Sequence, residues 1–196
     1  WSASLNAVVW VDIDGGRVLA TRSDGETSEL FALPGTIGAA LPGDGPALIL
    51  LAAPGVLAAR PGGDAHRPIG PGPRPGFRFN DAGLDPVGRV WAGVLPLIDP
   101  TPGSEPAGAL LRLDAAGEWH EEFGSMGCPN GIVWTADGRT MLVCESDSRR
   151  IAAADYDVAT GQASRWRIAW EFVGDVDAVP DGLEQLPDGR LWIAFW

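Results

Sequence analysis

Three polar side chains recur at the same place in three similar stretches of this sequence. Asn80, Asn130 and Asp181 each stand eight residues before a turn glycine, and they are 50 and 51 residues apart. Their amide and carboxylate oxygens are hard ligands that suit Ca²⁺, Mg²⁺ or Mn²⁺, and a set containing carboxylates can also hold Zn²⁺ or Fe²⁺. If the repeats are arranged in a ring, the three side chains converge and form a site for one divalent cation.

A purely structural interpretation of these residues is also available. Asn and Asp next to glycine are common turn formers, because their side chains hydrogen-bond to nearby backbone groups. Two neighbouring features favour a site. Arg78 stands two residues before Asn80 and could offer fixed donors to a polar substrate, and a proline precedes both Asn130 and Asp181.

The elements that must position these residues have the pattern of short β-strands. Helical periodicity is hard to find, and runs of apolar, β-branched or aromatic residues are bounded by Gly, Pro, Asn and Asp. Each run follows a tight-turn signal, and most are followed by a second strand-like element. The expected strands are 7–11, 17–22, 47–51, 55–59, 90–92, 109–113, 140–144, 150–156 and 191–194.

The repeat length indicates the architecture. Four strands per unit, in units of about 40–51 residues, are typical of β-propeller blades. A β-sandwich is the alternative, but it does not require a period near 50 residues. We therefore expect one all-β domain over residues 1–196, an incomplete propeller of about four to five blades, each a four-stranded antiparallel sheet. The stretch 61–76 is expected to be a Pro/Gly loop between units.

Composition argues against several classes of function. The net charge is −12, all 14 basic residues are Arg, and no basic stripe is present, so neither nucleic acid nor a membrane surface is an expected partner. Cys128 and Cys144 do not make a disulfide framework and are expected to be free thiols. The G-x-S-x-G motif of serine hydrolases is absent. No secretory signal is visible, which favours a cytoplasmic protein.

Several segments, in order along the chain, resemble one known family. The first contains Phe79-Asn80-Asp81 and continues through Asp85-Pro86-Val87-Gly88-Arg89 to Gly93, and the second begins Pro129-Asn130-Gly131. Residues 155–161 and 180–194 match two further motifs, and residues 10–14 are similar to the first blade. The family is that of senescence marker protein (regucalcin), gluconolactonases and related sugar lactonases.

The resemblance implies a six-bladed propeller that opens aldonolactones with one divalent metal in its central channel. Asn130 and Asp181 would be metal ligands, with Asp181 also the general base, while Asn80 and Arg78 would bind the lactone. The family's remaining ligand, a Glu, would lie upstream of Trp1, and one to two blades would follow the last residue. The fragment alone is therefore expected to be inactive, and the sequence determines neither the metal, which could be Ca, Zn, Mn, Mg or Fe, nor the oligomeric state.

Two segments depart from the family pattern. Residues 94–97 read Val-Leu-Pro-Leu where some members have an acidic substrate-binding residue, which leaves open a non-sugar lactone or another ester as the substrate. Residues 143–146 read Val-Cys-Glu-Ser where many members have Tyr-Ile/Val-Asp-Ser, a change expected to alter only packing. A non-catalytic propeller that binds calcium or another ligand is the alternative from a different class.

Overall fold

A computed structural model describes residues 1–45, 47–63, 66–98, 105, 107–174, 178–186 and 188–196. Every regular element in these residues is a β-strand, and none of them forms a helix with the length and hydrophobicity needed to cross a bilayer. The strands are β1 (Ala7–Asp12), β2 (Arg17–Arg22), β3 (Thr27–Ala32), β4 (Ile37–Pro42), β5 (Leu48–Ala52), β6 (Gly55–Ala59), β7 (Arg67–Gly70), β8 (Phe77–Leu84), β9 (Val90–Pro96), β10 (Gly108–Leu113), β11 (Trp119–Met126), β12 (Pro129–Trp134), β13 (Thr140–Glu145), β14 (Arg150–Asp157), β15 (Gln162–Glu171), β16 (Pro180–Gln185) and β17 (Leu191–Phe195).

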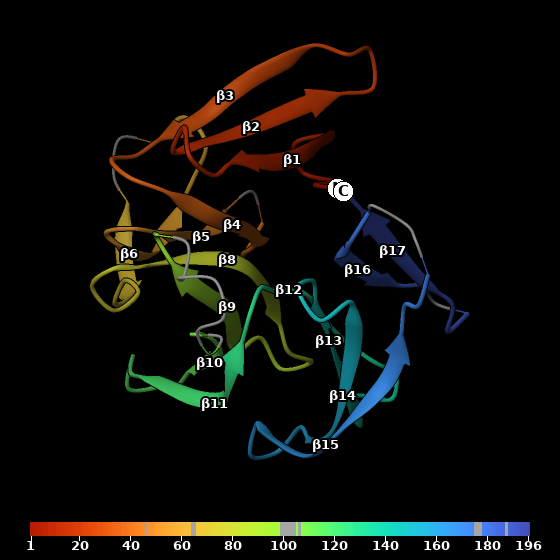
Figure 1. The fold of residues 1–196 in the computed structure, drawn as a ribbon. Helices are drawn as coiled ribbons and strands as arrows, with labels where there is room; N and C mark the ends of the chain where they lie inside the picture. Colours follow the sequence, from red (N-terminus) through yellow and green to blue (C-terminus); the bar gives the residue numbers. More distant parts are fainter. Residues whose placement is uncertain (46, 64–65, 99–104, 106, 175–177, 187) are drawn as a thin grey trace. The chain divides into compact units, whose positions relative to one another are not determined.

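The described strands form five sheets in which neighbours along the chain pair with each other (Figure 1). The sheets are β1–β3, β4–β7, β8–β11, β12–β15 and β16–β17, so three of them have four strands. Pairing is antiparallel wherever the register is described. Consecutive four-stranded meanders of this kind are propeller blades. The predicted all-β, incomplete propeller is therefore confirmed.

Tight turns set the boundary between the first and second strands of the blades. Gly45, Gly88, Gly138 and Gly189 have φ angles of 62°, 86°, 69° and 86°, in the left-handed region that glycine adopts at little cost. These are the turn glycines from which the repeat was counted. Asn6, with φ 50°, holds the matching place before β1.

The expected loop over residues 61–76 was wrong in one respect, because β7 lies inside it. This strand pairs with β6 through Val56↔Gly70, Leu57↔Pro68 and Ala58↔Arg67. It is the last strand of its sheet, where a proline is tolerated because its missing N–H faces away from the ladder. A short edge strand with a proline has no alternating pattern by which sequence could reveal it.

The chain divides into two compact units, residues 1–79 with 116–118, and residues 80–115 with 119–196. In the first unit, Val18 and Phe31 pack with Ile37, Leu50 and other apolar side chains, which joins the first two sheets. The expectation that residues 1–196 form a single domain stays a prediction.

In the second unit, the sheets pack face to face through two apolar clusters. Trp91 is fully buried, and its ring meets those of Trp134 and Tyr156 edge-on at 6.1 and 5.9 Å. This cluster joins the sheet of β8–β11 to that of β12–β15. A second cluster, which includes Ile151 and Leu183, joins β12–β15 to β16–β17. The packing brings together the first strands of successive sheets, which carry the candidate site.

Candidate functional site

The candidate site is built by the first strands of the sheets in the second unit. Asn80 lies in β8, Asn130 is the second residue of β12, and Asp181 is the second residue of β16. The pairing of β12 with β13 shifts register between Asn130 and Ile132, and that of β16 with β17 shifts between Pro180 and Leu183. Bulges of this type change the direction in which a side chain points.

A close approach of β12 and β16 places Asn130 next to the segment that carries Asp181. A Cβ atom built on Gly131 would lie 2.5 Å from Cβ of Leu183 and 2.7 Å from the carbonyl oxygen of Asp181. Real Cβ atoms do not approach other atoms so closely, so this position requires glycine. The glycine after Asn130 therefore allows two candidate ligand positions to lie in adjacent strands.

The side chains of Asn80 and Asn130 are in direct contact. Nδ2 of Asn80 donates to Oδ1 of Asn130 at 2.6 Å and to the carbonyl oxygen of Pro129 at 3.1 Å. Both residues are buried, with 8% and 6% of their surface exposed. Two of the three residues that recur in the repeats thus form one polar cluster.

Ser146 connects Asn130 to the start of β16. Nδ2 of Asn130 donates to Oγ of Ser146 at 2.8 Å, and that hydroxyl donates to the carbonyl oxygen of Pro180 at 2.6 Å. Pro180 immediately precedes Asp181. A continuous chain of hydrogen bonds therefore runs from β8 through β12 to the start of β16.

Two partly buried carboxyl groups, those of Asp81 and Asp181, lie beside this series of hydrogen bonds. Burial raises the pKa of Asp81 to about 6, and the negative charge of Asp181 also raises this pKa. Hydrogen bonds from the N–H groups of Ala82 and Gly131 lower the pKa, but burial has the larger effect. Burial also raises the pKa of Asp181. Desolvation disfavours the charged form of an acid, so a cation nearby would stabilise both carboxylates.

Cys144 is opposite Asn130 in the register of β12 and β13 and is fully buried. Burial raises the pKa of its thiol to about 12, and the charges of Asp181 and Asp81 contribute to the rise. This shift favours the thiol over the thiolate, and the thiolate is the nucleophilic and metal-binding form. Neither Cys144 nor the partly exposed Cys128 is joined in a disulfide within the described residues, as predicted.

The residues present fit a hard divalent cation. Oδ1 of Asn130 accepts one hydrogen bond and has a second lone pair. Asp181, in the neighbouring strand β16, would supply the carboxylate oxygens that such a cation prefers. Within the described residues, no three His, Cys, Asp or Glu side chains gather as a metal cluster. The first unit has no such residue at the matching position, where the fully buried Ile37 stands eight residues before Gly45.

Arg78, the other predicted substrate ligand, belongs to the first compact unit. Its Nη1 donates to the carbonyl oxygen of Phe79 at 3.2 Å, and the side chain is partly exposed. Its role toward substrate stays a prediction.

Two residues of the site were missed by sequence reasoning. Asp81 stands where the next two repeats have Gly131 and Gly182, and that exception in the repeat was a usable signal. Ser146 is the last residue of the segment 143–146 and stands where the family pattern also has Ser, so the departure expected to alter only packing concerns residues 143–145. Ser146 hydrogen-bonds to Asn130 and to the carbonyl oxygen of Pro180.

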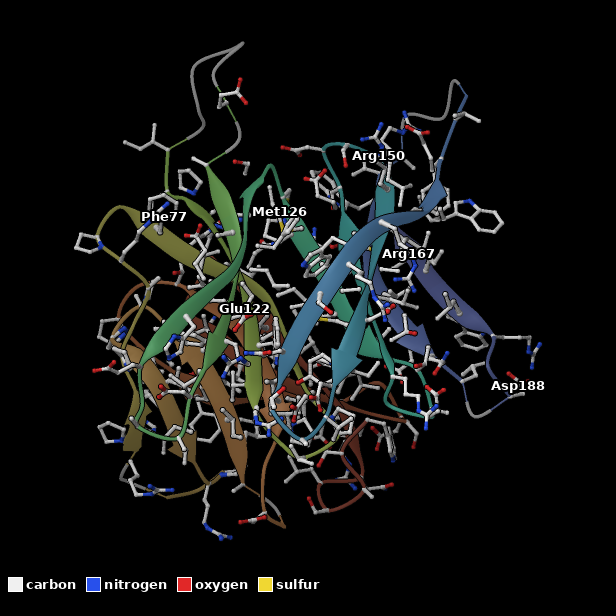
Figure 2. The ribbon with its side chains drawn as sticks, turned by 90° about the horizontal axis from the view of Figure 1, so that it is seen from below. Phe77, Glu122, Met126, Arg150, Arg167 and Asp188 are labelled. Carbon is white, nitrogen blue, oxygen red and sulfur yellow. The ribbon has the colours of Figure 1, made fainter. Side chains whose placement is uncertain are left out.

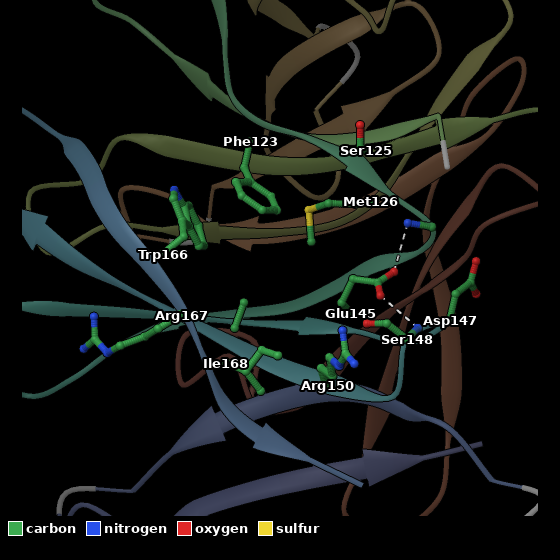
Figure 3. Close-up of a pocket in the computed structure, with 12 residues that line it drawn as sticks. Phe123, Ser125, Met126, Glu145, Asp147, Ser148, Arg150, Trp166, Arg167 and Ile168 are labelled. Atoms are coloured by element: carbon green, nitrogen blue, oxygen red, sulfur yellow. Dashed lines mark hydrogen bonds between the residues drawn. The ribbon is translucent and has the colours of Figure 1, made fainter. Parts of the chain in front are cut away.

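Glu145, which precedes Ser146, faces a separate pocket of about 500 Å³ beside β11, β14 and β15 (Figure 3). Figure 2 shows Met126 at the end of β11 and Arg150 at the start of β14, two residues that line this pocket. The rings of Phe123 and Trp166 form its apolar side, with their centroids 4.6 Å apart. The segment 145–146 therefore contributes one side chain to this pocket and the next to the candidate site.

Comparison with known proteins identifies the family. A family model described as SMP-30/Gluconolactonase/LRE-like region matches residues 1–196. The chain belongs to this family. It is 33% identical to regucalcin of Xenopus laevis over 122 residues, which are 62% of this chain and 40% of that protein. It is 32% identical to the pentonolactonase XacC of Haloferax volcanii over 119 residues, 61% of this chain and 38% of that protein.

The fold of this SMP-30/gluconolactonase family member is matched by solved structures. The structure of regucalcin from Agrobacterium tumefaciens, described as a calcium-binding protein, superposes with a TM-score of 0.85 at 20% identity. The match covers 100% of this chain and 65% of that protein. The chain thus spans about two fifths of the curated relatives and about two thirds of the structural one.

Proposed function

We propose that the intact protein hydrolyses a sugar lactone of the aldonolactone type, using one divalent metal held by Asn130 and Asp181. The observation that carries the proposal is the 2.6 Å contact of Asn80 with Asn130, next to the strand that presents Asp181. Membership of a family whose description includes gluconolactonase, and similarity to a pentonolactonase, support lactone hydrolysis as the reaction.

The residues of the site have distinct roles in this proposal. Asp181 accepts a proton from the attacking water as the general base, and burial raises its pKa, which makes it a stronger base than an exposed aspartate. A bound metal supplies Lewis-acid polarisation of the lactone carbonyl. Asn80 binds the lactone and stabilises charge that develops on its carbonyl oxygen. The bond from the carbonyl carbon to the ring oxygen then breaks, and the ring oxygen takes the proton held by Asp181, which gives the open-chain aldonic acid.

Acid release from lactones tests the proposal directly. With a pH indicator and a panel of sugar lactones, the intact protein should release acid, lose this activity in EDTA, and regain it when a divalent metal is restored. Asp181→Asn should lower kcat by about 100-fold or more, because the general base is lost. Asp188→Asn is the matched control, since Asp188 is an exposed turn carboxylate paired with Arg190 in the same sheet.

The alternatives give different results in the same assay. A propeller that only binds calcium or another ligand would release no acid from any lactone. Turnover of a non-sugar lactone or another ester, with none of sugar lactones, would contradict the substrate class while leaving the metal site in place. Activity that survives both EDTA and Asp181→Asn would overturn the proposed chemistry.

A further inference from the structure

Ser146 is a buried residue whose hydroxyl makes two hydrogen bonds and whose backbone N–H makes another. Only 2% of the residue is exposed. Its N–H donates to the carbonyl oxygen of Cys128 at 3.0 Å, its hydroxyl donates to the carbonyl oxygen of Pro180 at 2.6 Å, and Oγ accepts from Nδ2 of Asn130 at 2.8 Å. The hydroxyl therefore links the candidate ligand Asn130 to the residue before Asp181.

The single proton of this hydroxyl determines the orientation of the amide. A serine hydroxyl has one hydrogen to donate and two lone pairs to accept with. Because the hydrogen is given to Pro180, Oγ can only accept from Asn130, and the amide must present its nitrogen to Ser146. Its oxygen is then directed away from Ser146, toward Nδ2 of Asn80, which donates to it at 2.6 Å.

The orientation decides whether Asn130 can bind a cation. In a reversed amide, Nδ2 of Asn130 would face Nδ2 of Asn80, which places two donors against each other. The amide oxygen would then point at Ser146. An amide nitrogen has no lone pair to offer a metal, so a reversed Asn130 could not be a ligand on that side.

We propose that Ser146 is a positioning residue whose hydroxyl holds the amide of Asn130 with its oxygen turned toward the metal. The inference rests on the proposed function, because it takes Asn130 as a metal ligand. It assigns a specific task to the one residue of the segment 143–146 that agrees with the family pattern.

The hydroxyl of Ser146 can be tested separately from the local backbone, because Glu145 holds that backbone. Oε1 of Glu145 accepts from the N–H of Gly127 at 2.9 Å, and Oε2 accepts from the N–H of Ser148 at 2.8 Å (Figure 3). Oε1 also accepts from the N–H of Cys128 at 2.9 Å. These bonds tie the turn before β12 to the turn after β13. Removal of one hydroxyl at Ser146 leaves all of them in place.

Calorimetric titration of the intact, metal-free protein with Mn²⁺ tests the proposal through a double-mutant cycle. Ser146→Ala should weaken Mn²⁺ binding by about 10- to 100-fold, as the loss of an outer-shell partner does. Asn130→Asp should bind Mn²⁺ at least as tightly as the wild type, because both of its terminal atoms are oxygens and its orientation no longer matters. In the Asn130→Asp background, Ser146→Ala should then cause no loss.

Three further variants complete the design. Ser148→Ala removes an exposed hydroxyl two residues away and should leave Mn²⁺ affinity unchanged. Ser146→Cys nearly keeps the side-chain volume but is a poor hydrogen-bond acceptor, so it should weaken binding even if the alanine variant fails to fold. Asn130→Leu removes the ligand itself and should abolish binding at the site.

The outcomes separate the two claims. An equal loss of affinity from Ser146→Ala in the wild-type and Asn130→Asp backgrounds, or no loss in either, would overturn the role of Ser146 while the metal site stands. Wild-type affinity in Asn130→Leu would overturn the ligand assignment in the proposed function, and the inference with it.

Discussion

Nδ2 of Asn80 lies 2.6 Å from Oδ1 of Asn130, although 50 residues separate them along the chain. Each residue belongs to the first strand of its own sheet, and packing of the two sheets brings the strands together. The two residues meet because they occupy equivalent positions in the first strands of two sheets that pack against each other. A polar cluster shared between sheets is a site that neither repeat could form alone.

The first prediction concerns the pH dependence of stability and the carboxyl group of Asp81. Its pKa is raised from 3.8 to about 6, so its contribution to stability is full below pH 3.8 and is lost as the pH rises through 6. This shift corresponds to roughly 3 kcal/mol. In metal-free buffer, urea unfolding should show the stability of the wild type falling relative to Asp81→Asn between about pH 4 and pH 7.

The control for this measurement is Asp188→Asn. Hydrogen bonds with Arg190 lower the pKa of Asp188, so its contribution has the opposite sign and does not decline above pH 4. If the free energy of unfolding of the wild type varies with pH in parallel with that of Asp81→Asn across this range, the burial of the Asp81 carboxyl group is contradicted. Addition of a divalent cation should reduce the difference, because a cation stabilises the carboxylate.

The second prediction concerns a buried network that joins two sheets of the second unit. Asp85 is 4% exposed and accepts hydrogen bonds at Oδ2 from the hydroxyl of Tyr156 at 2.5 Å and from Nη1 of Arg89 at 2.8 Å. Burial acts to raise its pKa, but the hydrogen bonds from Tyr156 and Arg89 outweigh it and lower the pKa below 3.8. The guanidinium of Arg89 also donates to the carbonyls of Val158 and Ala159 at 2.9 Å.

Asp85→Ala should destabilise the protein by about 3 kcal/mol or more, because it leaves Arg89 without its buried partner. Tyr156→Phe removes one hydrogen bond from the same network and should cost about 1–2 kcal/mol. Thermal or urea unfolding of both variants at pH 7 measures the difference. Equal losses would show that the ion pair adds nothing to the hydroxyl contact.

The third prediction concerns the contact between β12 and β16. Gly131→Ala forces a Cβ against backbone and Cβ atoms of Leu183 and the carbonyl of Asp181, which should destabilise the protein by about 1–3 kcal/mol. It should also weaken Mn²⁺ binding, because it moves apart the strands that carry Asn130 and Asp181. Unfolding and titration of the same variant provide both readouts.

Gly124→Ala is the matched control for this substitution. A Cβ at Gly124 would meet Oε1 of Glu121 at 2.6 Å, and this atom is the end of a flexible side chain that can move away. The control should leave both stability and Mn²⁺ affinity close to those of the wild type. If Gly131→Ala behaves like Gly124→Ala, the two strands do not need their close approach.

Much of this fold could be predicted because each blade repeats its turn and strand pattern. The strands β2 and β6 have the predicted bounds, and Asn80 and Asn130 meet as the repeat requires. Ser146 could not be recognised, because its hydrogen-bond partners are on two segments, around residues 128–130 and at Pro180, that come close to it only in the folded chain. The edge strand β7 was missed because an edge strand with a proline has no alternating pattern.

The central claim is that oxygens of Asn130 and Asp181 hold one divalent cation. Crystals of the intact protein grown with Mn²⁺ would test it most directly through the anomalous scattering of the metal. We predict one strong anomalous peak at about 2.1–2.4 Å from Oδ1 of Asn130 and from a carboxylate oxygen of Asp181. A well-diffracting crystal with no peak between these residues, or with Mn²⁺ only at other carboxylates, would contradict the account.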